Sequence, residues 1–244
     1  MSAIHLAPTL AALPDPPRRA LARLGEIGCG AVQLGATQPG LRPRDLDRSG
    51  RRDLVATLRR LELALAGIDL WIPVDHFTVA AHVDRAVAAV CTAIDLAADV
   101  GGCPVSVTLP PEVDGLVVAK IVEHAEHRGV GVADHAVPPS DVAGLGVGID
   151  PAAWLADGRD PIAAVLEHAR RLCSVRVVDL LTTGLRGPPR GGSGSEGRLD
   201  LLAYRASVEI ARPGRPVVVD LRQWTDPWAG LTATCEAWEA AAPG

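Results

Sequence analysis

Aromatic residues are scarce in this sequence. Its 244 residues include one Phe, one Tyr and five Trp, so a core must be built mainly from Leu, Val, Ala and Ile. Hydrophobic residues make up 48% of the chain, which is enough to form one substantial core from these side chains. The length would permit two small domains, but barrels of about this size are commonly single domains. We therefore expect one domain over residues 1–244.

The sequence also lacks paired cysteine motifs. Its five cysteines are odd in number and far apart, with no CxxC, which argues against a zinc ribbon or a disulfide framework and favours a reducing compartment. The first residues carry no basic segment ahead of their apolar stretch, so a secretory signal is not expected. These features predict a cytoplasmic protein.

A basic surplus and a long apolar run are missing as well. The formal net charge is −5, whereas binding to a phosphate backbone usually needs a basic face, so nucleic acid is not an expected partner. No apolar run approaches the ~20 residues that a membrane span requires. The expected partner is a small molecule, and the oligomeric state is left open.

Short apolar runs instead alternate with longer amphipathic stretches. Runs rich in β-branched residues and flanked by Gly or Pro predict strands at 4–7, 31–34, 67–72, 104–109, 130–133, 146–149, 175–178 and 216–219. Helical spacing predicts helices at 17–27, 51–65, 82–100, 117–128, 160–172, 199–211 and 228–241. This alternation indicates parallel strands, and their number favours a closed (β/α)8 TIM barrel over a doubly wound open sheet. The segment 134–146 is too short for a full helix, so we expect the fifth helix to be missing or reduced.

Polar residues gather at the carboxyl ends of these strands, where such a barrel holds its active site. They are Gln33, Asp75, His76, Asp134, His135, Asp150, Asp179, Asp220, Arg222 and Gln223. Asp134, Asp150 and Asp220 could converge above the barrel axis and bind Mg²⁺ or Mn²⁺, which take oxygen ligands. A carboxylate at the end of an apolar strand needs a partner, and Asp is also a common helix cap. Asp150 is therefore a metal ligand, half of an ion pair or a cap.

The other polar residues at the strand ends are candidates for substrate contacts. Gln33, Asp75, His76, His135, Arg176 and Arg222 qualify by their position at the predicted barrel mouth. A histidine beside an aspartate is also suited to acid–base work.

A glycine-rich segment over residues 186–197 precedes the predicted seventh helix. Its GxGxxG spacing is a weak dinucleotide signal, because no strand immediately precedes it. Barrels often hold phosphate on backbone N–H groups at this place, which makes Gly192, Gly194 and Arg198 candidates for phosphate binding, with help from Arg186 and Arg190. The alternative is a mobile surface loop.

The sequence resembles the xylose isomerase-like TIM barrels, a family of sugar-phosphate isomerases and epimerases, over nearly its whole length. LARLGEIGCGAVQLGA is similar to the family's first helix and second strand, and RAVAAVCTAIDLAADVG to its long third helix. GVGIDPAAWLADGRDP resembles the sixth strand and its return, and GGSGSEGRLDL the approach to the seventh helix. The resemblance implies a sugar-like ligand and metal ligands Glu, Asp, His and Glu on strands five to eight, with the two Glu residues moving a proton beside the sugar carbonyl.

At those four positions this sequence has Asp134, Asp150, Arg176 and Asp220. The resemblance thus implies Asp134 and Asp220 as the proton-transfer pair. Each shortened side chain retracts its carboxylate by roughly 1.5 Å, whereas metal distances tolerate about ±0.2 Å, and a guanidinium cannot ligate a metal.

Arg176 can pair with carboxylates instead and so supply the positive charge in place of the metal. Two functions follow: a sugar isomerase or epimerase, or a non-catalytic relative that binds a carbohydrate-like ligand or a partner.

Overall fold

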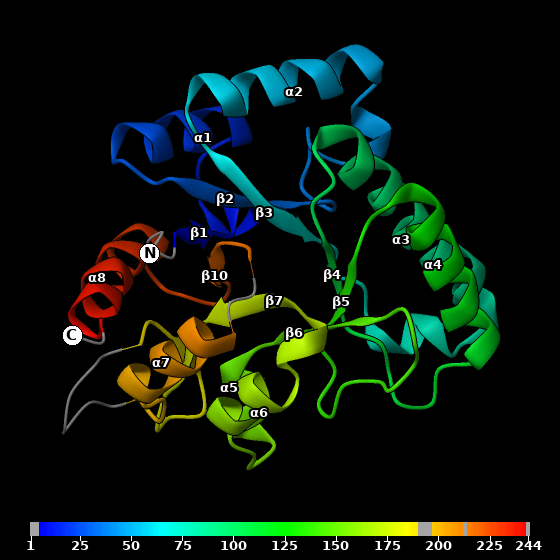
Figure 1. Cartoon of the computed structure of the whole chain (residues 1–244). Coiled ribbons are helices and arrows are strands. Elements are labelled where there is room, and N and C mark those ends of the chain that lie inside the picture. Colours follow the sequence, from blue (N-terminus) through cyan, green and yellow to red (C-terminus); the bar gives the residue numbers. More distant parts are fainter. Residues whose placement is uncertain (1–4, 190–196, 212–213, 243–244) are drawn as a thin grey trace.

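The computed structural model describes residues 5–189, 197–211 and 214–242, and it shows eight parallel strands in a nearly closed barrel surrounded by helices (Figure 1). The barrel strands are β1 (Leu6–Pro8), β2 (Ala31–Gly35), β3 (Ala64–Asp69), β4 (Val105–Val107), β5 (Val132–Asp134), β6 (Gly146–Ile149), β7 (Leu172–Val177) and β10 (Val217–Val219). They pair in the order β1-β10-β7-β6-β5-β4-β3-β2, and a bridge between Thr9 and Gln33 joins the two ends. The predicted (β/α)8 barrel is confirmed.

Eight α-helices accompany the strands in the described residues. They are α1 (Pro17–Glu26), α2 (Arg48–Arg60), α3 (Ala80–Val100), α4 (Gly115–Arg128), α5 (Pro151–Ala156), α6 (Pro161–Glu167), α7 (Leu201–Ala211) and α8 (Pro227–Ala240). The connection from β5 to β6 contains no helix, which confirms the expected loss of the fifth helix. Both α5 and α6 follow β6, and a short antiparallel hairpin of β8 (Asp179–Leu180) and β9 (Arg186–Gly187) follows β7.

Aspartate caps and prolines set the starts of several helices. The side chains of Asp114, Asp150, Asp160 and Asp226 each accept a hydrogen bond from a backbone N–H in the first turn, which satisfies a donor that lacks a partner within the helix. Proline occupies the first position of α5, α6 and α8, where its missing N–H costs nothing.

The predicted boundaries around β3 were wrong on both sides. The predicted helix 51–65 ends at Arg60, and Glu62 at φ 55° turns the chain into a strand that starts at Ala64. The predicted strand 67–72 ends at Asp69, and the Trp71 that follows is 64% exposed. Because the sequence from Leu61 to Ile72 is almost continuously apolar, its periodicity does not mark where one element ends. The predicted helix 160–172 was also too long, since α6 ends at Glu167 and β7 starts at Leu172.

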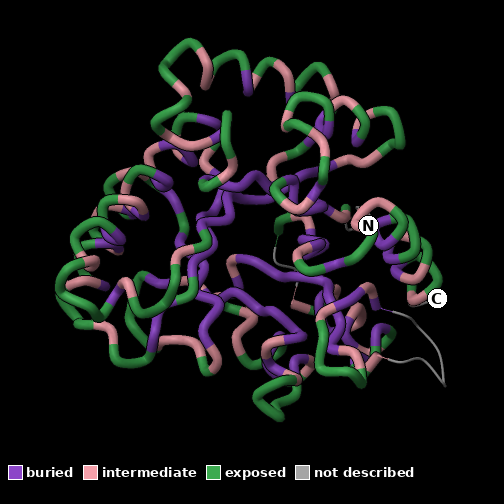
Figure 2. The backbone as a smooth tube through the Cα atoms, turned by 180° about the vertical axis from the view of Figure 1, so that it is seen from behind, coloured by how far each residue is buried: buried purple, intermediate pink, exposed green. Residues whose placement is uncertain are grey.

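The core lies on both faces of the barrel wall. Figure 2 shows buried residues along the strands and exposed residues on the outer sides of the helices. Aliphatic side chains fill the layer between strands and helices, as the scarcity of aromatic residues predicts. Among the described residues, no helix is both long enough and apolar enough to cross a membrane.

Candidate functional site

Strand register defines which side chains face the barrel interior. Residues that are direct partners on neighbouring parallel strands point to the same face of the sheet; on β3 to β6 one such row is Asp69, Ser106, Ala133 and Gly146. The next row is Val107, Asp134 and Val147, and its two valines pack in the aliphatic layer beneath the helices. The first row therefore faces inward and the second outward.

Six charged side chains meet at the carboxyl end of the barrel, and we call them the mouth cluster: Asp69, Asp150, Arg176, Arg186, Asp220 and Arg222. Arg176, on β7, is 4% exposed. It donates from Nη2 to Asp69 Oδ1 at 2.7 Å and from Nη1 to Asp150 Oδ2 at 3.1 Å. Its Nη1 also lies 3.7 Å from Asp220 Oδ2. The expected pairing of Arg176 with a strand-end aspartate is confirmed.

Arg186 and Arg222 complete the mouth cluster. Arg186 Nη2 donates at 2.7 Å to both Asp150 Oδ2 and Asp220 Oδ2. Arg222 binds Asp220 with two bonds, from Nε to Oδ1 at 2.8 Å and from Nη2 to Oδ2 at 2.6 Å. Since three guanidinium groups face three carboxylates, the formal charges balance. Charged pairs of this geometry are strong, and the balance offsets the desolvation of the buried ions.

The arginines keep the cluster's carboxylates ionised. Burial raises the pKa of Asp150, but Arg186 and Arg176 outweigh it and lower the net pKa. For Asp220, burial is likewise outweighed, here chiefly by the hydrogen bonds from Arg222 and by the charge of Arg176, and the pKa falls well below its ordinary value. A carboxylate with so low a pKa is a weak proton acceptor at neutral pH.

The lowered pKa values predict acid sensitivity of the fold. A group whose folded pKa is lowered contributes stability above its unfolded pKa of about 4 and loses it as the pH falls towards the folded pKa. We expect the free energy of unfolding, measured with urea, to start falling as the pH drops below about 4 and to keep falling towards the lowered pKa values of folded Asp150 and Asp220. The substitution Asp220→Asn should reduce this slope and lower stability at pH 7.

The control for that experiment is Asp157→Asn, because Asp157 pairs with Arg159 at an exposed site. Burial raises the pKa of Asp134 and Asp179, and a raised pKa changes the pH dependence of stability in the opposite direction. This contribution is the same in the parent protein, Asp220→Asn and Asp157→Asn, so it does not affect their comparison. If Asp220→Asn kept the slope of the parent protein, the pairing of Asp220 with the arginines would be contradicted.

Asp150 combines two of the three roles open to it from the sequence. Its Oδ1 accepts from the backbone N–H of Ala153 at 3.2 Å and caps α5. Its Oδ2 accepts from Arg176 and Arg186. Both oxygens are thus engaged, one as a helix cap and the other in ion pairs.

The structure does not bring Asp134 into the mouth cluster. Asp134 lies in the outward-facing row, and its carboxylate accepts backbone N–H bonds from Leu109 at 3.1 Å, Ala136 at 3.0 Å and Ser140 at 3.3 Å. These contacts hold the connections that follow β4 and β5. The expected proton-transfer pair of Asp134 and Asp220 is therefore not assembled.

The side chains at the mouth do not fit a divalent cation. Of the three expected ligands, Asp134 faces outward, while Asp150 and Asp220 accept from guanidinium groups. Across the part of the chain that the structure describes, no three His, Cys, Asp or Glu side chains are grouped as metal ligands.

The remaining expected substrate contacts fall at different depths. His135 is 4% exposed, its Nε2 lies 3.2 Å from Ser106 Oγ, and burial lowers its pKa well below the ordinary value, so that the ring is neutral. Gln33 lies deep in the interior at 1% exposure. Asp75 and His76 lie at the rim; Asp75 lines the mouth pocket, and the His76 ring packs on His82.

The expected phosphate-binding residues lie partly outside the described part of the chain. Gly192 and Gly194 lie outside the described residues. The backbone N–H of Arg198 donates to Asp179 Oδ1 at 2.9 Å, and its side chain lines a separate pocket beside α6. Asp179, expected at the end of the seventh strand, instead anchors the chain that leads into α7.

Sequence reasoning missed Asp69 as a member of the mouth cluster and did not expect Arg186 there. Asp69 lies within a run that is otherwise apolar, and that lone carboxylate was the available signal. Arg186 reaches the cluster from the β8–β9 hairpin. The strands β8 and β9 have only two residues each, which is too short for an alternating pattern of apolar and polar residues to reveal them in the sequence.

A pocket of about 430 Å³ opens over the mouth cluster. Its polar lining comes from Asp69, Asp75, Ser106, Thr108, Arg176 and Arg222. Trp71 supplies an apolar surface that is 64% exposed. The pocket therefore offers hydrogen-bond donors, acceptors and one flat aromatic face to a small molecule.

No protein-family model and no curated protein matches this sequence. Solved structures do match in fold. The xylose isomerase domain protein from Planctomyces limnophilus has a TM-score of 0.71 and 17% identity, over 98% of this chain and 95% of that one. An L-ribulose 3-epimerase has a TM-score of 0.71 and 16% identity, over 98% and 96%. The D-psicose 3-epimerase of Clostridium cellulolyticum, solved with D-tagatose, has a TM-score of 0.70 and 11% identity, over 98% and 96%. The resemblance to xylose isomerase-like barrels is confirmed in the fold.

Proposed function

We propose that the barrel mouth binds a neutral, sugar-like small molecule. The observation that carries this proposal is the exposed Trp71 beside a charge-balanced set of donors and acceptors in one pocket. A sugar ring presents apolar C–H faces that pack on an indole, and its hydroxyl groups need both donors and acceptors. The pocket volume lies in the range of small-molecule sites. The similar epimerase solved with D-tagatose supports the same ligand class.

Arg176 takes the place that the resemblance gives to a metal-binding histidine, and we propose that it supplies the positive charge there. Its guanidinium contacts Asp69 and Asp150 and lies near Asp220. A permanently charged group at this position keeps the carboxylates ionised and fixed in direction. The acceptor oxygens that face a ligand are thereby oriented before it binds.

Binding without proton transfer is the function that this geometry supports best. Asp220 is held by two hydrogen bonds from Arg222 and one from Arg186, and Asp134 faces away from the mouth. A second candidate, isomerase or epimerase activity, is favoured by His135: its neutral ring lies within the field of the cluster and its Nδ1 has no hydrogen-bond partner among the described residues. A neutral imidazole has a nitrogen lone pair that can accept a proton, but the lowered pKa makes His135 a weak base at neutral pH, which leaves binding as the first candidate.

The substitution Trp71→Ala tests the binding proposal. We expect calorimetric titration with D-tagatose, D-fructose and L-ribulose to show binding by the parent protein that becomes about tenfold weaker in Trp71→Ala, because the loss of an aromatic contact of 1–2 kcal/mol corresponds to roughly that factor. Leu116→Ala, which removes an 80% exposed side chain on α4, is the control and should bind like the parent. Equal affinities of Trp71→Ala and the parent would refute this ligand site.

Incubation of the same sugars with the protein separates binding from catalysis. We expect that chromatography of the incubated samples will detect no interconversion of the sugars. Interconversion that persists in Asp220→Asn and stops in His135→Asn would instead establish an enzyme that uses the imidazole.

A further inference from the structure

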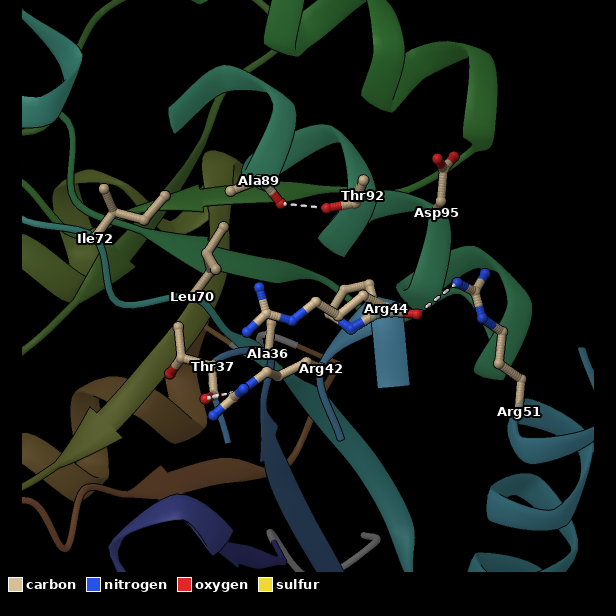
Figure 3. A pocket seen from close by; sticks show the side chains of 11 residues that line it. Ala36, Thr37, Arg42, Arg44, Arg51, Leu70, Ile72, Ala89, Thr92 and Asp95 are labelled. Atoms are coloured by element: carbon tan, nitrogen blue, oxygen red, sulfur yellow. Dashed lines mark hydrogen bonds between the residues drawn. The ribbon is translucent and has the colours of Figure 1, made fainter. Parts of the chain in front are cut away.

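A second cavity, of about 610 Å³, lies outside the barrel, next to α2, α3 and the segments that follow β2 and β3. Three arginines line it: Arg42 directly before the short 3-10 turn Pro43–Asp45, Arg44 within that turn, and Arg51 on α2. Leu70 and Ile72 form part of its apolar wall. Figure 3 shows the guanidinium groups of Arg42 and Arg44 directed towards the side formed by Ala36, Thr37 and Leu70.

Arg51 has a structural role in this cavity. Its Nη1 pairs with Asp99, and its Nε and Nη2 donate to the backbone oxygens of Leu46 at 3.1 Å and Pro43 at 3.3 Å. Arg51 thereby fixes the segment that carries the other two arginines.

Arg42 and Arg44 are neutralised only weakly. Both approach one carboxylate, Asp45, at 4.0 Å and 3.9 Å respectively, and Asp45 Oδ2 already accepts from the backbone N–H of Gly40 at 2.9 Å. Asp95, which lines the cavity itself, is paired with Arg128 at 3.0 Å and contacts His124 at 3.1 Å. The cavity therefore carries an excess of positive charge, whereas the mouth cluster is balanced.

We propose that this cavity binds a small molecule through a phosphate group, which Arg42 and Arg44 hold. Guanidinium groups match phosphate oxygens with paired hydrogen bonds, and two of them from one short turn converge on a single anion. The apolar wall of Leu70 and Ile72 contacts the rest of the ligand. These two residues also line the mouth pocket, so the phosphate site and the mouth are neighbours with a thin wall between them.

The experiment uses inorganic phosphate as the probe, titrated by calorimetry at constant ionic strength in chloride. We expect the double variant Arg42→Gln with Arg44→Gln to bind phosphate at least about tenfold more weakly than the parent, since each charge-assisted bond contributes more than 1 kcal/mol. Arg52→Gln is the matched control, because Arg52 is an exposed arginine of α2 that does not line the cavity. It should bind phosphate like the parent protein.

Trp71→Ala distinguishes this site from the mouth. It should retain phosphate binding in full, even where it loses the sugar. A titration with a sugar phosphate then shows whether the phosphate belongs to the ligand of the mouth. If both the double arginine variant and Trp71→Ala bind the sugar phosphate more weakly, one ligand spans both pockets. If only the double arginine variant binds it more weakly, the cavity holds a separate ligand. Phosphate binding that is unchanged in the double variant would overturn the proposal, whatever the sugar titrations show.

Discussion

Replacing Arg176 by methionine should lower the free energy of unfolding by about 3–5 kcal/mol, because removal of one partner from a buried ion pair leaves an uncompensated charge. Arg176 is 4% exposed, and its Nη atoms contact Asp69 and Asp150. Methionine keeps an unbranched side chain in the barrel interior, so the loss reports mainly on charge and hydrogen bonding. Urea denaturation at pH 7, followed by circular dichroism, measures the change.

The control for Arg176→Met is Arg159→Met. Arg159 pairs with Asp157 at 2.7 Å, but half of its side chain is exposed, and such pairs typically contribute less than about 1 kcal/mol. A loss in Arg176→Met no larger than in Arg159→Met would show that the mouth cluster does not depend on this guanidinium. The double variant Arg176→Met with Asp69→Asn should recover part of the loss, since Asp69 loses its hydrogen-bonded cation whereas Asp150 keeps Arg186 at 2.7 Å.

The barrel could be predicted from the sequence because its determinants are local. The apolar runs around β2, β6 and β10 are short and bounded by Gly or Pro, and Asp160-Pro161 marks the start of α6 in the expected cap-then-proline order. The short connection after β5 also required no knowledge of tertiary packing. Boundaries failed where an apolar stretch crosses from helix to strand to loop, as around β3.

The candidate site could be predicted only in part, because its members depend on the direction of each side chain. Asp134 and His135 are adjacent, and a strand sends adjacent side chains to opposite faces. Which of the two faces inward follows from the register with Ser106 and Gly146, and register is a property of the assembled sheet. A site residue chosen by family position alone was therefore one residue away from the inward face. Arg176 was identified because it occupies the position that the resemblance gives to a metal-binding histidine, and a buried cation at that position requires a carboxylate partner.

Exchanging the arginines for a metal-binding set provides a further strong test. We expect Mn²⁺ to leave the melting temperature of the parent protein unchanged, since Asp150 and Asp220 accept from fixed cations. The substitution Arg176→His alone would place an imidazole where the resemblance expects a metal-binding histidine. The structure requires more, because Arg186 contacts both carboxylates at 2.7 Å and would still repel the ion.

The variant Arg176→His with Arg186→Gln removes both cations from Asp150 and introduces an imidazole nitrogen beside Asp69 and Asp150, the donor types that Mn²⁺ accepts. At a Mn²⁺ concentration a hundred times the dissociation constant, its stability should rise by about 2.7 kcal/mol through mass action. Arg176→Gln with Arg186→Gln carries the same charge without the imidazole and should gain less. Because each variant is compared with itself in the presence and absence of Mn²⁺, any loss of stability from the substitutions cancels. Tight binding of Mn²⁺ by the parent protein would instead require the carboxylates to release their arginines, and the role proposed for Arg176 would then be wrong.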